Sequence, residues 1–543
     1  MSEAAPDAPA GPPAPAPDPQ GAAAPPSAVE RVRRRLALRW VRAATEARTI
    51  VLFAAAVRAA TAWLDPALVN DAVSLLRAAE RLRTDGAAAL LQVPHHPLPV
   101  AAFALARSTG APEAAARGMC VLAAAAAVWP LHALARRAAG RHAAAAACIL
   151  YAVLPKAVAV GATPLSEAFF LPLLLGALAA AAAARDAGRR GARRLVGAGL
   201  LCGLGYLARP EALAALPAVL ASAALDGRPG KLRRAALVLA GFLLVAAPYA
   251  GALSDAHGRF SVSPKKDVVR FAGFEEVAAG SAPSAPATAW SGTAAAFDGA
   301  LTTPVAALVL VGLLAPGRWR RRRSRRPRLI LAGTALVLGA LVFRLQAGWG
   351  YSGGRHALGA AVLLLPFAGA GLAVVARVLP RVTSQRRFAL VAALLLALPL
   401  GARAVLRPPG AGGVGARSLG ELLAERVDPA EAASPIVVAT SGRPLVAWYA
   451  ERALEPDGLR VEDLPLWGRH VRRVRDAESA REVAADVERA LRDGGATWIV
   501  LRAAAPEDDP ERRLAVALAE RGVLGAPPVG AGSDLAAWPI RRR

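Results

Sequence analysis

Long apolar runs alternate with short arginine-rich blocks along most of the chain. The runs are rich in Ala, Leu and Val, and each approaches the length that a helix needs to cross a bilayer. We therefore predict an α-helical polytopic membrane protein with about 11 transmembrane helices. The expected spans cover residues 49–64, 113–134, 142–159, 165–184, 195–208, 211–225, 235–253, 303–316, 329–345, 357–376 and 388–405.

The basic blocks determine the predicted topology. If each predicted span crosses the membrane once, the loops lie alternately on its two sides. Blocks such as RDAGRRGARR (185–194) and GRWRRRRSRRPR (317–328) then all lie on the same side of the membrane. Cytoplasmic loops are enriched in Lys and Arg, so this side is expected to be the cytoplasm. The N-terminus is then cytoplasmic and the C-terminus is outside. The predicted transmembrane domain, 31–410, has its large outer loops at 65–112 and 254–302.

The two ends of the chain differ from this middle part. Residues 1–30 are rich in Ala and Pro and cannot bury a core, so we predict a disordered cytoplasmic tail. Near the C-terminus, PIVVAT (435–440) and TWIVLR (497–502) are typical of buried strands. Segments with apolar positions at helical spacing lie around them. Residues 415–543 are therefore expected to form a small extracytoplasmic α/β domain with a mostly parallel sheet.

Charge and cysteine content narrow the possible classes of function. The net charge is +26, and 55% of residues are hydrophobic. Because the arginines lie between apolar runs, the charge indicates membrane topology and not nucleic-acid binding. The cysteines, Cys120, Cys148 and Cys202, lie in apolar runs and support neither a disulfide framework nor a thiolate metal site. The Ala-, Arg- and Pro-rich composition favours a GC-rich bacterial genome, and hence the bacterial inner membrane.

The first outer loop places an acidic residue at the predicted membrane boundary. Asp71 follows the first span and begins an expected amphipathic helix over residues 71–83. Asn70 or Asp71 can cap this helix, or the Asp71 carboxylate can act as a general base toward an acceptor hydroxyl. The local sequence leaves both interpretations open. HHPLP (95–99) is interpreted as the joint between two interfacial helices, because adjacent histidines point apart and do not suit a metal pair.

The order of span, acidic residue, amphipathic helix, HHPLP and next span resembles the GT-C glycosyltransferases, especially the protein O-mannosyltransferase-like and lipid A aminoarabinose transferase-like families. TPLSEAFF (163–170) resembles the Ser-Glu start of their fourth span. LVGAGLLCGLGYLARPEALAALPAVL (195–220) resembles their fifth and sixth spans. GGRHALGAAVLLLPFAGAGLA (353–373) resembles the Arg-aromatic start of a late span. The resemblance covers about residues 45–405.

This resemblance implies a GT-C-like fold and an inverting transfer of a sugar from a polyprenyl-phosphate donor to an acceptor hydroxyl on the extracytoplasmic face. Asp71 would be the catalytic base and would also touch a metal. Glu167 would bind a divalent cation, Mg²⁺ or Mn²⁺, that neutralises the donor phosphate. The alternative for Glu167 is a helix N-terminal carboxylate stabilised by the helix dipole. Two departures stand out: Ala72 replaces the second acidic residue of many relatives, and His356 replaces the usual Tyr.

The implied leaving group is a lipid phosphate, so cationic residues are expected to converge on the outer rim. Arginine suits phosphate because its guanidinium can donate two parallel hydrogen bonds. A salt bridge to Glu211 is the alternative role for Arg209, and a solvated charge is the alternative for the loop lysines. The candidates for binding the donor phosphate are Arg209, Arg355, His356, Lys265, Lys266 and Lys156.

Two other classes of function remain open from the sequence. One is a multispan transporter or lipid flippase, and the other is a non-catalytic protein of envelope assembly. Transporters often contain internal repeats and ionisable residues near the middle of the membrane. Here no repeat is visible, and the ionisable residues lie mostly at span ends. The acceptor, whether glycan, lipid or protein, is not indicated by the sequence.

Overall fold

The computed structural model describes a helical part and a C-terminal part of the chain, each with gaps. The expected tail at 1–30 and the candidates Lys265 and Lys266 lie outside the described residues. The described ranges are 46–65, 67–184, 190–224, 230–264, 286–315, 322–349, 352–378, 385–407, 414–427, 436–440, 444–454, 461–465, 474, 476–493, 495–502, 509–525, 528–530 and 535–540.

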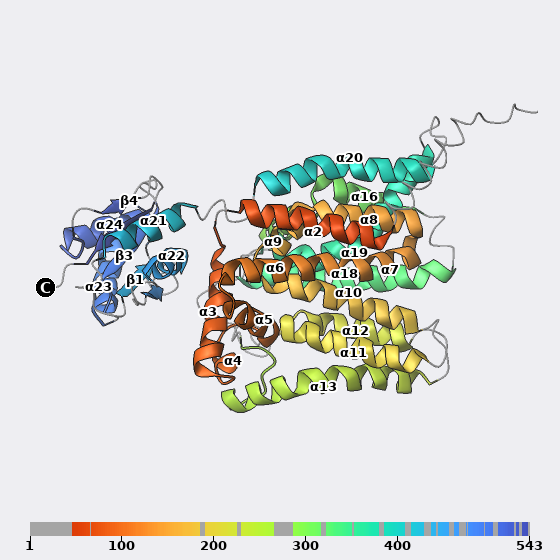
Figure 1. Cartoon of the computed structure of the whole chain (residues 1–543), viewed down its shortest axis with the longest axis horizontal. Coiled ribbons are helices and arrows are strands. Elements are labelled where there is room, and N and C mark those ends of the chain that lie inside the picture. Colours follow the sequence, from red (N-terminus) through yellow and green to blue (C-terminus); the bar gives the residue numbers. More distant parts are fainter. Residues whose placement is uncertain are drawn as a thin grey trace, which may run out of the picture. The chain divides into compact units, whose positions relative to one another are not determined.

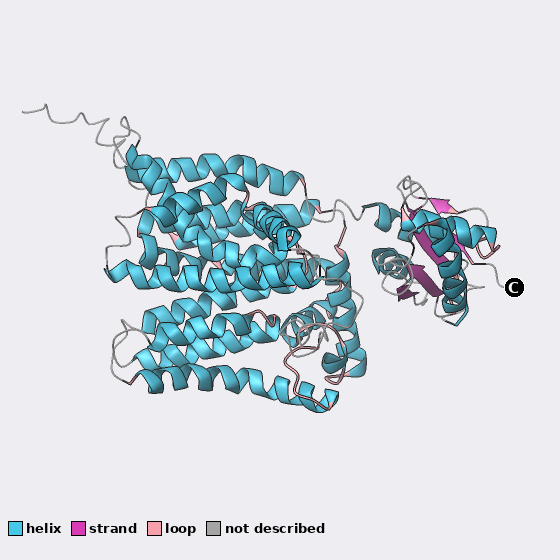
Figure 2. Ribbon diagram, turned by 180° about the vertical axis from the view of Figure 1, so that it is seen from behind, coloured by secondary structure: helices cyan, strands magenta, loops and turns pink. Residues whose placement is uncertain are grey.

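Apolar helices run side by side through the helical part, as seen from both sides in Figures 1 and 2. Each of the apolar runs expected from the sequence coincides with one or two of these helices. They are α2 (Ala47–Leu64), α6 (Pro112–Ala126), α7 (Val128–Ala139), α8 (Arg141–Val153), α9 (Pro155–Ala162), α10 (Ser166–Ala184), α11 (Gly191–Ala208), α12 (Ala212–Ala224), α13 (Lys231–His257), α15 (Pro286–Leu301), α16 (Thr303–Leu314), α18 (Arg322–Trp349), α19 (Gly354–Val378) and α20 (Gln385–Leu406).

Some of these helices are long and apolar enough to span a membrane, and others are shorter. Among the described residues, 6 helical stretches are long and apolar enough to cross a membrane, and 8 if each of two bent pairs counts as one span. The bent pairs are α8 with α9 and α15 with α16. Helices such as α12 and α20 have shorter apolar stretches. The helical membrane fold is therefore clear, whereas the count of about 11 spans stays a prediction.

A buried arginine closes the break between α8 and α9. The two helices meet at an angle of 58°, and Pro155 at the start of α9 lacks the N–H that would continue the helix. Arg58 on α2, which is fully buried, donates instead to the carbonyls of Tyr151 and Ala152, at 3.2 Å each. The guanidinium thus satisfies backbone acceptors that have no water available within a membrane.

Three helices form a layer at one end of the bundle. They are α3 (Asn70–Asp85), α4 (Ala89–Gln92) and α5 (Pro97–Arg107), and α3 lies across the bundle axis (Figure 1). The predicted amphipathic helix is confirmed, because α3 buries one apolar face, including Val73 and Leu76. The N-cap residue is Val69, so Asn70 and Asp71 lie in the first turn of the helix and not at the N-cap position.

The two histidines of HHPLP point in different directions, as predicted for a joint between helices. His95 lies 2.8 Å from the hydroxyl of Ser74 on α3. The buried His96 lies 3.2 Å from Ser263 and packs edge-on against Tyr206. The pair therefore connects α4 and α5 to two different neighbours and does not form a shared metal site.

The C-terminal part is a five-stranded sheet with helices on both faces (Figure 2). Its strand order is β2-β1-β3-β5-β4; β1 pairs in parallel with β2 and β3, and β5 is antiparallel to β3 and β4. The elements are α21 (Val414–Glu425), β1 (Ile436–Thr440), α22 (Pro444–Leu454), β2 (Val461–Pro465), α23 (Ala477–Asp493), β3 (Trp498–Arg502), α24 (Pro510–Glu520), β4 (Val529–Gly530) and β5 (Leu535–Pro539).

The two strands predicted from the sequence form as β1 and β3, but the sheet is mixed and not mostly parallel. The short link between β4 and β5 accounts for the antiparallel pairing of these two strands, since parallel neighbours need a crossover of about a dozen residues. Alternate residues of β3 face opposite sides of the sheet. Ile499 and Leu501 pack with the helices α23 and α24, whereas Val500 packs with α21 and α22.

Candidate active site

An ion pair joins the first outer loop to the start of a late helix. Asp71 lies in the first turn of α3, and its carboxylate accepts a hydrogen bond from the guanidinium of Arg355, in the first turn of α19. The side chains are 46% and 30% exposed, so water or a ligand can reach both groups. Two candidates from distant parts of the sequence therefore lie in direct contact.

The position of Arg355 depends on close backbone packing at the start of α19. A Cβ on Gly354 would lie 2.9 Å from the carbonyl carbon of Gly299 on α15, so only glycine permits this approach. His356 Nδ1 accepts the Gly353 N–H at 3.1 Å, and Ser352 donates to Gln346 on α18 at 2.8 Å. These contacts hold the turn before α19, and with it the residue that reaches Asp71.

A second ion pair lies at the tip of the α11–α12 hairpin. The Glu167 carboxylate, at the start of α10 and only 4% exposed, contacts the guanidinium of Arg209. Arg209 also binds Glu211 through two nitrogens, at 2.5 and 3.1 Å, and donates to the Ser166 hydroxyl at 3.2 Å. Both alternatives raised for these residues are therefore present: Glu167 lies in a helix's first turn, and Arg209 forms a salt bridge with Glu211.

The charge of Arg209 is secured by its surroundings. Burial is the largest single influence and favours the neutral form of the guanidinium. The nearby carboxylates of Glu167 and Glu211 together outweigh it and raise the pKa of Arg209 above its ordinary value. This residue is thus a permanent cation at the end of the bundle, with carboxylates on more than one side.

The two ion pairs belong to one cluster. His356 lies within electrostatic range of Arg355, Arg209 and Glu167, and Lys156 on α9 lies within range of Glu167. Six candidates from four helices and one hairpin tip therefore meet: Asp71, Lys156, Glu167, Arg209, Arg355 and His356. The carboxylates of Asp71, Glu167 and Glu211 balance its three cations, and the two guanidinium groups among these cations suit an anionic ligand such as a phosphate.

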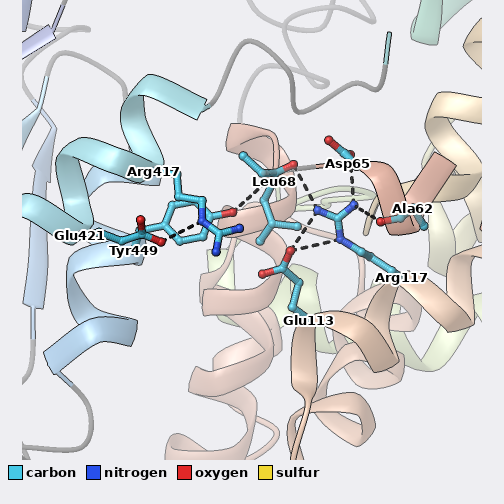
Figure 3. Close-up of polar contacts among 9 residues, drawn as sticks. Ala62, Asp65, Leu68, Glu113, Arg117, Arg417, Glu421 and Tyr449 are labelled. Carbon is cyan, nitrogen blue, oxygen red and sulfur yellow. Dashed lines mark hydrogen bonds and ion pairs between the residues drawn. The ribbon is translucent and has the colours of Figure 1, made fainter. Parts of the chain in front are cut away.

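A third polar network beside this cluster was not predicted from the sequence (Figure 3). The buried Arg117 on α6 pairs with Asp65 at 3.1 Å and with Glu113 at 3.0 Å. It also donates to the carbonyls of Ala62 and Ala67, at 3.3 and 3.1 Å. A charged residue inside an apolar run is costly in a membrane and needs a polar partner. The positions of Arg117 and Arg58 within such runs could therefore have predicted buried polar contacts for both residues.

The carboxylates of the cluster do not form a metal site as they stand. Asp71 and Glu167 each contact a guanidinium, and these two carboxylates belong to separate ion pairs. Within the described ranges, no group of three or more His, Cys, Asp or Glu side chains has the arrangement to hold a metal ion. The divalent cation implied by the resemblance therefore enters no step of the chemistry below.

Comparison with known proteins agrees with the fold. Residues 95–251 match the family model described as dolichyl-phosphate-mannose-protein mannosyltransferase. Comparison of the whole sequence with curated proteins finds no match. The matched segment includes the start of α10 and the α11–α12 hairpin, which supply Glu167 and Arg209.

Solved structures of similar fold were also found. ArnT from Cupriavidus metallidurans in the apo state has a TM-score of 0.56 and 14% identity, covering 90% of this chain and 97% of that chain. The same protein bound to undecaprenyl phosphate has a TM-score of 0.55, with 14% identity and the same coverage. The Archaeoglobus fulgidus oligosaccharyltransferase in the apo form has a TM-score of 0.49 and 15% identity, covering 84% of this chain and 69% of that chain.

The chain is therefore an integral membrane protein with the GT-C fold of membrane glycosyltransferases. The similarity to ArnT extends over nearly the full length of both chains. This confirms the fold class that the order of motifs predicts. The family model matched over residues 95–251 supports glycosyl transfer as the general class of activity.

Proposed function

We propose that this protein is an inverting glycosyltransferase that moves a sugar from a polyprenyl-phosphate donor to an acceptor hydroxyl. The observation that carries the proposal is the meeting of Asp71, Arg355, Glu167 and Arg209 at one end of a GT-C fold. A carboxylate serves as a general base, and guanidinium groups stabilise a phosphate leaving group. The similar ArnT structure with undecaprenyl phosphate supports a lipid phosphate as that group.

The reaction is a single displacement at the anomeric carbon of the donor sugar. The acceptor oxygen forms a new bond to this carbon while the bond from carbon to the phosphate oxygen breaks. The electron pair of the broken bond leaves with the polyprenyl phosphate, and the hydroxyl proton passes to the Asp71 carboxylate. Attack from the side opposite the leaving group inverts the configuration of the sugar.

Arg355 connects donor binding to the activation of Asp71. Without ligand, its guanidinium contacts the Asp71 carboxylate. A dianionic or monoanionic phosphate competes for the same donors, and both side chains are partly exposed. We propose that the donor phosphate takes over Arg355, with Arg209, His356 and Lys156 nearby, and that Asp71 is then able to accept the acceptor proton. Lys265 and Lys266, outside the described residues, remain proposed phosphate ligands.

The proposed location is the bacterial inner membrane, with the α3 end of the bundle facing the periplasm. The basic blocks between spans support this orientation. On this topology the C-terminal sheet domain is periplasmic as well. The lipid-linked donor reaches the cluster laterally from the outer leaflet.

The test is sugar transfer from purified polyprenyl-phosphate donors by the full-length protein in nanodiscs. Wild type is expected to transfer sugar and release polyprenyl phosphate. Asp71→Asn is expected to lower kcat by about 10²- to 10⁴-fold, the usual contribution of a general base. Glu167→Gln is expected to lose activity because Arg209 loses its buried partner. NMR of the product should show the inverted anomer.

Glu80→Gln is the matched control, since it neutralises another carboxylate of α3 that pairs with Arg107 away from the first turn. It should keep near wild-type turnover. No transfer by wild type from a broad panel of lipid-linked sugars, with no binding of polyprenyl phosphate, would overturn the proposal. A cation requirement is tested in the same assay by chelation and by adding back Mg²⁺ or Mn²⁺.

A further inference from the structure

The link between α2 and α3 sets the position of Asp71. After α2 ends at Leu64, the chain passes through Ala67, Leu68 and Val69, and α3 starts at Asn70. The Val69 carbonyl accepts hydrogen bonds from the first-turn amides of α3, at 2.9 and 3.2 Å. A displacement of this link therefore moves the first turn, and Asp71 with it.

The transmembrane bundle holds one side of the link. Arg117 on α6 binds the Asp65 carboxylate and the Ala67 carbonyl, both at 3.1 Å. Its side chain is 7% exposed and that of Asp65 is fully buried. Because the guanidinium donates to side chains and backbone together, it holds the chain as it leaves the membrane in one arrangement.

The C-terminal domain holds the other side. The Leu68 N–H donates to the hydroxyl of Tyr449 on α22, at 2.9 Å (Figure 3). Leu68 is fully buried and Tyr449 is 6% exposed. The guanidinium of Arg417 on α21 lies 5.2 Å from the centre of the Tyr449 ring, which orients the ring from behind. Burial raises the pKa of Tyr449 to about 12, so its hydroxyl stays protonated at neutral pH.

The surface around this hydrogen bond is continuous and apolar. Leu68, Val73 and Leu76 of the loop belong to the same buried cluster as Val446 and Tyr449 of the C-terminal domain. Polar contacts lie at its margin. Arg107 lies over the ring of Trp448, 5.7 Å from its centre, and Arg77 is 3.9 Å from Glu451. The hydrogen bond is therefore shielded from water, which strengthens it.

We infer that Tyr449 is a positioning residue for the proposed catalytic base: through Leu68 it fixes the first turn of α3, so that the C-terminal domain affects the reaction through the placement of Asp71. This inference rests on the proposed function, because it concerns the placement of Asp71. Misplacement of a reacting group by about 1 Å can cost on the order of 10²-fold in rate. The C-terminal domain then contributes to the active site through the Leu68 backbone and not through a side chain at Asp71.

The test is Tyr449→Phe in the full-length protein, which keeps the ring and removes only the acceptor oxygen. Hydrogen exchange of the Leu68 amide should become about three- to tenfold faster, the usual effect of losing one hydrogen bond. The kcat for sugar transfer should fall about tenfold with KM for donor and acceptor unchanged, and the thermal unfolding midpoint should stay within the error of wild type. Unchanged exchange and unchanged kcat would overturn the inference.

Arg481→Ala is the matched control in the same domain. Arg481 is 69% exposed on α23, on the other face of the sheet, and pairs only weakly with Glu520 at 3.5 Å. It should leave both readouts unchanged; an equal loss of kcat in Arg481→Ala and Tyr449→Phe would overturn a specific role. If wild type transfers no sugar, the proposed function fails by itself, and Leu68 exchange still decides whether Tyr449 holds the link.

Discussion

Asp71 and Arg355 stand 284 positions apart in the sequence and form one ion pair at the end of the bundle. Each lies in the first turn of its helix, Asp71 in α3 and Arg355 in α19. The contact is partly exposed, so its net contribution to folding is small, on the order of 1 kcal/mol or less. We therefore expect this ion pair to matter for ligand binding more than for stability.

Arg355→Gln should separate donor binding from base catalysis. The substitution removes the guanidinium that is proposed to bind the donor phosphate, so KM for the lipid-linked donor should rise about 10- to 100-fold, as expected for the loss of charge-assisted hydrogen bonds. Arg355→Lys should raise the donor KM less, because lysine keeps the positive charge but lacks the two parallel N–H donors of the guanidinium. Steady-state kinetics at varied donor concentration measure this KM. An unchanged donor KM in Arg355→Gln would contradict the assignment.

Glu167→Gln should destabilise the protein more than Glu211→Gln. Both carboxylates bind Arg209, but the Glu167 side chain is 5% exposed and that of Glu211 is 32% exposed. Removing one partner of a buried ion pair commonly costs on the order of 3 kcal/mol, and the exposed partner costs much less. Thermal unfolding in detergent measures the difference. Equal midpoints for the two variants would show that burial does not strengthen this pair.

Gly161→Ala should destabilise the bundle through Arg58. A Cβ at Gly161 would lie 2.6 Å from Arg58 Cδ and 2.8 Å from Ala124 Cβ, and Arg58 is held by backbone carbonyls. Overpacking of this kind costs about 1–3 kcal/mol. Gly197→Ala in α11 is the control, because nothing lies within 4 Å of its Cβ position. The unfolding midpoint should fall for Gly161→Ala only; a fall of the same size in both would disprove the steric explanation.

Thiol labelling should reveal the proposed orientation. The native cysteines are all buried, so introduced cysteines are the expected reactive sites. Arg81→Cys, exposed on α3, should react with a membrane-impermeant maleimide in intact spheroplasts. Arg136→Cys, exposed near the end of α7 and in a predicted cytoplasmic loop, should react only after permeabilisation. The reverse pattern would invert the topology and place the cluster on the cytoplasmic side.

The sequence by itself determined the membrane class, the apolar helices and the amphipathic helix α3. These features depend on the spacing of apolar residues within each segment, which can be recognised from the sequence alone. It also singled out Asp71, Glu167, Arg209 and Arg355, through the order of motifs in a resemblance. The mixed sheet was not foreseen, because the pairing of β5 with β3 depends on a contact between distant segments.

Only the tertiary structure decided which charged residues meet. Whether Asp71 caps α3 or faces a cation cannot be read from its neighbours, because its partner, Arg355, comes from α19. The contacts of Arg117 and Tyr449 with the link before α3 were missed for the same reason, because each comes from a distant part of the sequence. Ion pairs and hydrogen bonds between distant segments form only when packing brings them together, and that packing is a property of the whole fold.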